Sequence, residues 1–246
     1  MGESDVPRSM DALLIAAASG MKARLESLDM LANNIANSGT SGFKADHEFY
    51  SLVQDQLPLV ERNWTDFSQG VLTPTANPLD LALSGPGFFA LNSPAGVVYT
   101  RNGQFQVGTS NQLQTAEGFT LRNTRDNGRP IAVDPALPVS IAKTGVVAQG
   151  GQEIAQIEIA GLGADANSGS LAKQGNSYFR LAAPGILPPA PTTEVMQGTL
   201  EQSNVPAADS AVRLVNVMRQ FEMLQRAVTL SADMDKQAIS EVAKVS

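Results

Sequence analysis

Residues 28–44 have the sequence LDMLANNIANSGTSGFK, which changes within a short stretch from an apolar helical pattern to small polar residues. Asparagine is unfavourable inside a helix because its amide competes for backbone hydrogen bonds. Asn33, Asn34 and Asn37 therefore indicate the end of a helix, and Asn37 with Gly39 are the candidates for a left-handed C-cap. The stretch predicts a boundary between a long N-terminal helix and a chain of different character.

The helix before this boundary carries an apolar heptad pattern. From Asp11 to about Asn37 there is no proline, and apolar residues recur at alternating steps of four and three. Such a repeat is typical of an a/d seam that packs against another helix. The seam positions are Leu14, Ala18, Met21, Leu25, Leu28, Ala32 and Ile35.

The C-terminal segment repeats this pattern. Its seam is formed by Leu214, Val217, Phe221, Leu224 and Val228. The predicted helix runs from about Pro206, which suits a first helical turn, to about Val242. Beyond Val228 the seam reaches the polar Ser231 and Asp235, so we expect a register shift onto the parallel stripe of Leu230 and Met234.

The middle of the chain has a β pattern. The stretch 79–92, LDLALSGPGFFALN, predicts two short strands around the turn 84–87, and 154–162, IAQIEIAGL, predicts one alternating strand. Further turns are indicated at 102–103, 110–111 and 117–118. Turn signals that recur about every 8–12 residues are typical of a compact all-β domain.

Composition excludes several classes of function. The net charge of −7, without a basic cluster, argues against a nucleic-acid surface. The chain has no cysteine, and its single histidine, His47, lacks companions at metal-ligand spacing. No nucleophile–histidine–acid arrangement is recognisable, so we predict no catalytic residues, no cofactor and no metal. No apolar run approaches the length of a membrane span, and residues 1–10 do not resemble a secretory signal peptide.

These patterns predict an α+β fold in which terminal heptad helices flank a central all-β domain of short antiparallel strands. The expected divisions are an extension at 1–10 (a tag or a misassigned start), a helix and extended segment at 11–69, a β domain at 70–195 and a helical segment at 196–246. Neither terminal helix can bury its apolar stripe alone, so the helices must pair with each other or with other chains. The layout favours an assembly protein.

Three sequence blocks resemble the flagellar axial proteins, the family of rod and hook subunits. The first is 28–50, with ANNIAN followed by Gly42-Phe43-Lys44. The second comprises 77–91, 99–107 and 111–121, and the third is 197–228, with the pattern G-x-L-E-x-S-N-V. The run RQFEM at 219–223 is most similar to the proximal-rod branch of the family, and distal-rod and hook subunits are its close relatives.

The resemblance implies a structural subunit of the flagellar basal-body rod that is exported by the type III apparatus without a cleaved signal peptide. It implies that the terminal helices pair into an assembly coiled coil with other rod subunits, while the β domain faces outward. The partners would be rod subunits and the export apparatus, without nucleic acid or membrane insertion. The expected assembly interface comprises Leu14, Met21, Leu25, Leu28, Asn33, Asn34, Ile35, Asn37, Phe43, Leu214, Val217, Phe221, Leu224 and Val228.

Two hypotheses remain open from the residues alone. In the first, the chain is a rod subunit and the three asparagines bond neighbouring subunits or backbone at the helix end. In the second, a ligand-binding β domain is presented on a coiled-coil stalk. The second hypothesis requires a concave pocket with convergent polar groups within 70–195.

Overall fold

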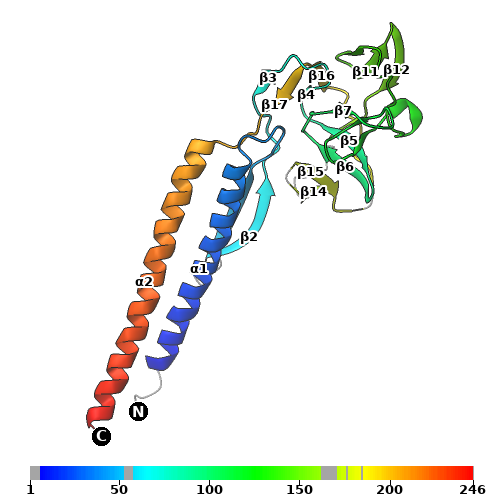
Figure 1. Cartoon of the computed structure of the whole chain (residues 1–246). Coiled ribbons are helices and arrows are strands. Elements are labelled where there is room, and N and C mark those ends of the chain that lie inside the picture. The colour runs from blue at the N-terminus through cyan, green and yellow to red at the C-terminus, as the bar shows by residue number, and fades with distance from the viewer. Residues whose placement is uncertain (1–5, 53–57, 162–170, 176, 184, 246) are drawn as a thin grey trace. The chain divides into compact units, whose positions relative to one another are not determined.

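The computed structural model describes residues 6–52, 58–161, 171–175, 177–183 and 185–245, with side chains except at 6–16, 49–52, 58–63, 235, 238–239 and 241–245. Two compact units divide the chain. The helical unit comprises 1–36, 46–64 and 206–246, and the β unit comprises 37–45 and 65–205. The predicted combination of two terminal helices with a central domain of antiparallel strands is confirmed (Figure 1).

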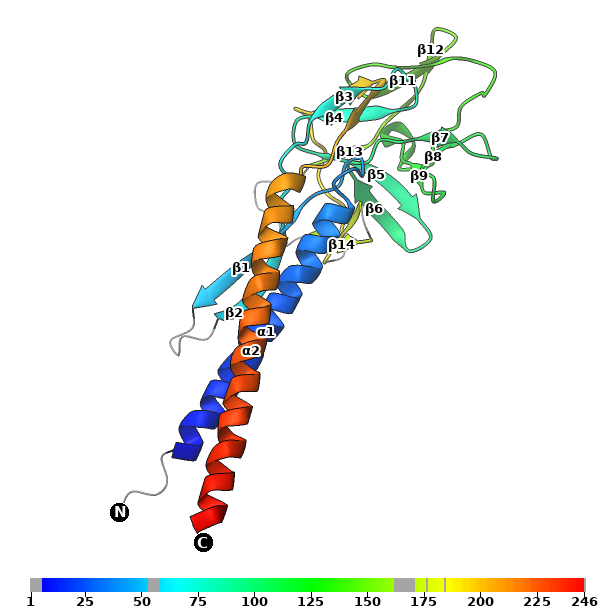
Figure 2. The ribbon, with the colours of Figure 1, turned by 60° about the vertical axis from the view of Figure 1, so that its left-hand side comes forward.

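The helical unit consists of two long helices and a hairpin. Helix α1 spans Val6–Ala36 and contacts helix α2, which spans Ala207–Val245 (Figure 2). Strands β1 (Asp46–Leu52) and β2 (Pro58–Thr65) form the hairpin, and β1 contacts α1. Because α1 begins at Val6, it includes the last residues of the expected N-terminal extension. Within the described helices no stretch is long and apolar enough to cross a membrane.

The expected left-handed C-cap of α1 is wrong, because neither Asn37 nor Gly39 has a positive φ angle. The chain beyond the helix instead closes two successive turns. The Thr40 N–H donates to the Asn37 carbonyl (3.0 Å), and the Phe43 N–H donates to the Thr40 carbonyl (3.2 Å). The left-handed residue is Gly42, with φ of 68°. These turns satisfy carbonyls near the helix end without a left-handed residue at that point.

The described part of the β unit contains one large sheet and three small ones, and their strands pair antiparallel. The eight-stranded sheet has the order β14-β15-β6-β5-β9-β8-β7, with β13 also paired to β5. Its strands are β5 (Phe88–Ser93), β6 (Gly96–Thr100), β7 (Gln106–Val107), β8 (Leu113–Gln114), β9 (Thr120–Leu121), β13 (Ile159–Ala160), β14 (Leu171–Gln174) and β15 (Tyr178–Leu181). The small sheets pair β10 (Val139–Ile141), β11 (Val146–Gln149) and β12 (Gln152–Gln156); β4 (Leu81–Ser84) and β16 (Glu194–Gln197); and β3 (Leu72–Pro74) and β17 (Thr199–Glu201).

The two strands predicted around 84–87 are β4 and β5, and their inward residues build the main core of the β unit. Leu81 and Leu83 of β4 pack in one cluster with Phe89 and Leu91 of β5. The predicted turns at 110–111 and 117–118 are confirmed, because Asn111 and Gly118 have positive φ angles. A short 3₁₀ helix, η1 (Thr124–Asp126), follows β9.

The single strand predicted at 154–162 is wrong. Strand β12 ends at Gln156 and belongs to the three-stranded sheet, whereas β13 pairs with β5 in the large sheet. Between them the Ile157 N–H donates to the Gly145 carbonyl (2.8 Å), and the Glu158 N–H donates to the Arg122 carbonyl (2.9 Å). An unbroken alternation of apolar residues thus serves two sheets, because alternation specifies a buried face and not the partner strand.

Candidate functional site

Two segments that are distant in sequence meet within the β unit where the chain enters from α1 and leaves towards α2. We call the segments 42–45 and 199–205, with the residues bonded to them, the junction. The Gly42 N–H donates to the Glu201 carbonyl (2.7 Å), and the Asn204 N–H donates to the Phe43 carbonyl (3.4 Å). The first and third blocks of the rod-like sequence pattern are therefore joined by backbone hydrogen bonds.

A buried ionic cluster lies at the centre of the junction. Lys44 Nζ donates to Glu201 Oε1 (2.6 Å), and Arg101 Nη1 donates to Glu201 Oε2 (3.1 Å). The side chains of Lys44 and Glu201 are 0 % exposed and that of Arg101 is 3 % exposed. Because each residue comes from a different sequence block, the cluster forms only when all three blocks are in place.

Backbone groups form further hydrogen bonds with these charges. Lys44 Nζ also donates to the Ser68 carbonyl (2.5 Å), and Arg101 Nη2 donates to the Gly85 carbonyl (2.7 Å). Glu201 Oε1 additionally accepts from the Gly70 N–H (2.9 Å). A buried charge is tolerated only when it is paired and hydrogen-bonded, and each of these three groups has an ionic partner and at least one hydrogen bond. Within the described residues, Arg101 Nε is a buried donor without a hydrogen-bond partner.

The cluster holds two cations against one carboxylate. Burial lowers the pKa of Lys44 and of Arg101, while the Glu201 carboxylate acts in the opposite direction on both. Since Glu201 is the partner shared by both cations, it is the residue on which the ionic part of the junction depends. This arrangement has a structural role, because its three charged groups are shielded from solvent.

Apolar and amide contacts surround the ionic cluster. Phe43, Ala45 and Val205 form a small buried cluster of their own. Asn204 accepts from the Ala45 N–H (2.8 Å) and donates to the Asp66 carbonyl (2.8 Å). These contacts fix the residues on either side of Lys44. Lys173 Nζ adds a further contact, because it donates to the Lys44 carbonyl (2.9 Å) and lies 4.0 Å from the centroid of the Phe43 ring.

The asparagines of the opening stretch have different environments. Asn34, which is buried in the helical unit, donates to the Asp46 carbonyl (2.8 Å) and accepts from the Asp46 N–H (3.0 Å). Asn37 is buried in the β unit, where its amide oxygen accepts from Thr40 Oγ1 (3.3 Å). Asn33 is exposed. Asn34 therefore bonds a backbone group, as one of the two expected kinds of partner, and this group belongs to Asp46 at the start of β1. The two hydrogen bonds attach the hairpin to α1.

The predicted seam of α2 coincides with the face that is shielded in the helical unit. Leu214, Val217, Phe221, Leu224 and Val228 are all half-buried, whereas most of their neighbours along the helix are exposed. Leu224 lies against Gly20 of α1. The seam continues at the half-buried Ser231. The expected shift onto Leu230 and Met234 is wrong, because these side chains are 64 % and 59 % exposed.

Helix α1 turns a different face inward from the one that its heptads predict. Its buried side chains are Ala23, Ser27, Leu31 and Asn34. Of the predicted seam, Met21, Leu28 and Ile35 are half-buried and Leu25 is 51 % exposed, while the side chain of Leu14 lies outside the described residues. The small side chains of Ala23 and Ser27 on the inner face allow α2 and the hairpin to approach α1. The heptad residues of α1 are therefore half-buried at the edge of this contact or exposed.

Phe43 also differs from its expected place. It was expected at an assembly interface, and its side chain is 0 % exposed inside the junction. Sequence reasoning also missed Lys44, Arg101 and Glu201 as a group. No local signal set these three charges apart, because each rod-like block also carries other charged residues.

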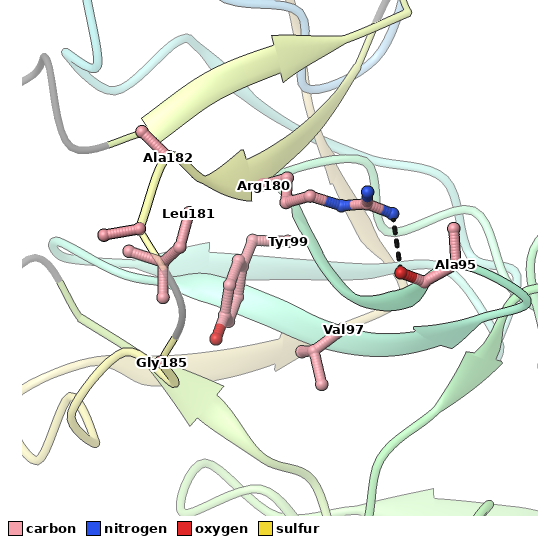
Figure 3. A pocket seen from close by; sticks show the side chains of 8 residues that line it. Ala95, Val97, Tyr99, Arg180, Leu181, Ala182 and Gly185 are labelled. Carbon is pink, nitrogen blue, oxygen red and sulfur yellow. Dashed lines mark hydrogen bonds between the residues drawn. The ribbon is translucent and has the colours of Figure 1, made fainter.

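Two hollows on the β unit are the candidates for a ligand site. One, of about 340 Å³, is lined by residues that include Tyr99, Arg180 and Leu181. Figure 3 shows the Arg180 guanidinium directed at the Ala95 carbonyl, to which it donates (2.9 Å). The Tyr99 hydroxyl accepts from the Leu187 N–H (3.0 Å). Because the protein itself already binds these polar groups, the hollow does not support the ligand-binding hypothesis.

In the second hollow, of about 680 Å³, polar groups of the lining are likewise bonded to other groups of the protein. At its rim Lys143 pairs with Glu194 (3.3 Å), and Gln156 donates to the Thr144 carbonyl (3.4 Å).

In the described part of the chain no three His, Asp or Glu side chains gather as metal ligands. His47 stacks on Trp64 with ring centroids 4.9 Å apart, which is a packing contact in the hairpin.

Comparisons with known proteins agree with the three sequence blocks. Residues 14–44 match the flagella basal body rod protein family, 82–149 match the flagellar hook protein FlgE/F/G D1 domain, and 196–241 match the flagellar basal body rod FlgEFG protein C-terminal family. The flagellar basal-body rod protein FlgF of Caulobacter vibrioides is 31 % identical over 96 % of this chain and 99 % of its own length. FlgF of Mesorhizobium japonicum is 30 % identical over 95 % and 98 %, and FlgG of Caulobacter vibrioides is 29 % identical over 92 % and 97 %.

Proposed function

The chain belongs to the flagellar basal-body rod protein family and is a structural subunit of the rod, and from this premise we propose that it occupies the proximal part of the rod. The observation that carries the proposal is the similarity to FlgF proteins along almost the whole chain. The RQFEM run at 219–223 also favours the proximal branch. The distal-rod position is the second candidate, supported by the similarity to FlgG.

We further propose that the terminal helices join the chain to other rod subunits. The support is the uncovered apolar surface of the helical unit. Six of the thirteen exposed large apolar side chains among the described residues belong to α2, and Leu25 belongs to α1. Apolar surface of this extent on helices usually marks a protein–protein contact. The subunit would reach the rod through the flagellar type III export apparatus, without a cleaved signal peptide, and would lie in the periplasm-spanning part.

The axial position can be tested by placing a peptide tag in the exposed turn at Gly150–Gly151, between β11 and β12. The tagged chain replaces the native copy, and restored swimming is the control that the tag is tolerated. We expect labelled basal bodies to carry the tag on the proximal rod. A tag found along the distal rod or in the hook would contradict the proximal assignment and leave family membership intact.

A further inference from the structure

The last segment of the β unit, residues 193–205, is bonded to several of its earlier elements, and we call this segment the strap. It contains strands β16 and β17, which pair with β4 and β3 in two small sheets (Figure 1). In the sheets that the structure describes, β4 and β3 have no other strand partner. Both strands therefore remain unpaired until the strap is in place.

Gln197 attaches the first half of the strap to two separate parts of the β unit. Its Oε1 accepts from the Ile141 N–H (3.0 Å), and its Nε2 donates to the carbonyls of Pro78 (2.8 Å) and Val139 (2.9 Å). Val195, two residues earlier, is buried in the main core. This half of the strap thus connects β10 to the turn that precedes β4.

The second half of the strap binds the entry segment, residues 42–45. The Gly198 N–H first donates to the Asp80 carbonyl (2.8 Å). Beyond it, each of the four residues of the entry segment forms a hydrogen bond with Glu201 or Asn204. The place of the entry segment in the β unit therefore depends on the strap.

The large sheet does not depend on the strap in this way. Its eight strands, as far as the structure describes them, include neither β16 nor β17. The core cluster around Phe88, Tyr99 and Phe179 likewise contains no strap residue among those described. The contacts of this sheet and cluster can form before the strap docks, whereas the bonds of the entry segment cannot.

We propose that the strap and the entry segment dock together as the last step in closing the β unit, and that they open together while the large sheet stays intact. Regions that open below global unfolding are cooperative units of contiguous contacts, and the strap with its partners is such a region. A chain that has been made only as far as residue 192 lacks every bond between strap and entry segment.

This inference rests on the proposed function and concerns its regulation. Late closure keeps the entry segment, and with it the connection to α1, unfixed by the β unit until most of the chain has been made. The N-terminal block is then free to meet the export apparatus.

The chain provides two glutamines with matching bonds for a test. Gln149 of β11 lies outside the strap, and its Oε1 accepts from the Asp134 N–H (2.9 Å). Its Nε2 donates to the carbonyls of Asp134 (2.9 Å) and Leu137 (3.0 Å). None of these partners, and none of the three partners of Gln197, belongs to the entry segment. An effect on the entry segment that only Gln197→Ala produces must therefore pass through the strap.

Thiol labelling of the purified full chain reads out the opening, because the natural chain has no cysteine. Ala45→Cys reports on the entry segment and Ala90→Cys on β5 of the large sheet, and the two alanines are 1 % and 0 % exposed. Each reporter is combined with Gln197→Ala or with Gln149→Ala, and the rate of reaction with a small maleimide is measured without denaturant. Rates are compared within one reporter, so the effect of the cysteine itself cancels.

We expect Gln197→Ala to speed the labelling of Ala45→Cys roughly tenfold, because three backbone groups lose their hydrogen-bond partner and the open form becomes more populated. The labelling of Ala90→Cys should not change, and Gln149→Ala should leave the labelling of Ala45→Cys unchanged. Equal acceleration of both reporters, or none at Ala45→Cys, would overturn the proposal. An equal effect of the two glutamine substitutions on Ala45→Cys would also overturn it. Each of these results leaves the axial position in the rod unaffected, since the tagged chain tests that separately.

Discussion

Replacing Glu201 with Ala is expected to lower the free energy of unfolding of the β unit by about 3–5 kcal/mol, the range seen when one partner of a buried ion pair is removed. The variant would leave Lys44 and Arg101 buried without a carboxylate, and the Gly70 N–H would lose its acceptor. Lys44→Met should cost less than Glu201→Ala, because it leaves the Arg101–Glu201 pair balanced. This order of effects is specific to a cluster with two cations and one anion.

Urea unfolding of the full chain, followed by near-ultraviolet circular dichroism, measures the effect. Tyr99 and Tyr178 are partly or fully buried in the β unit and report on its packing. The control is Glu153→Ala, which removes the exposed ion pair between Arg125 and Glu153 (2.8 Å) and should cost less than about 1 kcal/mol. A Glu201→Ala variant that loses no more stability than this control would contradict the role of the cluster.

Gly42→Ala is the second substitution with a large expected effect, a loss of about 2–5 kcal/mol from strain and overpacking together. Gly42 has φ of 68°, a conformation that side chains with a Cβ rarely adopt. A Cβ there would lie 2.3 Å from the carbonyl carbon of Arg101 and from the nitrogen of Asn102. Because these are backbone atoms, the steric clash can be relieved only if the junction opens.

The chain provides a matched control three residues earlier. At Gly39, an added Cβ would meet no atom within 4 Å, and the φ angle is not left-handed. Gly39→Ala should therefore be neutral or slightly stabilising, since it reduces the freedom of the unfolded chain. The same unfolding measurement compares the two variants, and equal effects would show that Gly42 is not a point of close approach.

The spacing of apolar residues and the positions of turn residues correctly predicted helix faces and turns, because both depend on residues that are close in the sequence. The spacing of Leu214, Val217 and Phe221 predicts that they form one apolar seam of α2, because the helical period fixes which residues share a face, and all three are half-buried in the helical unit. The turn at Gly118 was likewise readable, since glycine adopts its conformation without strain. The heptad pattern did not predict that Ser27 of α1 is buried. A heptad pattern shows which face of a helix is apolar, but it does not show which face meets a given partner.

The junction could not be predicted from local pattern, because it depends on partners that are far apart in the chain. Lys44 and Glu201 are 157 residues apart, and Arg101 and Glu201 are 100 apart. Lysine, arginine and glutamate are almost never fully buried unless paired, and the sequence of a short block does not show where the partner of its charge lies. The expected β domain of 70–195 also stops short of Glu201, which lies in the strand β17 that pairs with β3.

A closed junction is expected to stabilise the β unit, and we propose that the uncovered faces of the helices are needed for assembly. The most direct test deletes residues 11–36 and 207–246 and leaves 37–205 unchanged, in a strain that lacks the native copy. Purified basal bodies are then assayed for the chain, and swimming is scored. We expect the shortened chain to be absent from basal bodies, with incomplete rods and no motility. Complete rods and normal swimming with both helices deleted would contradict it.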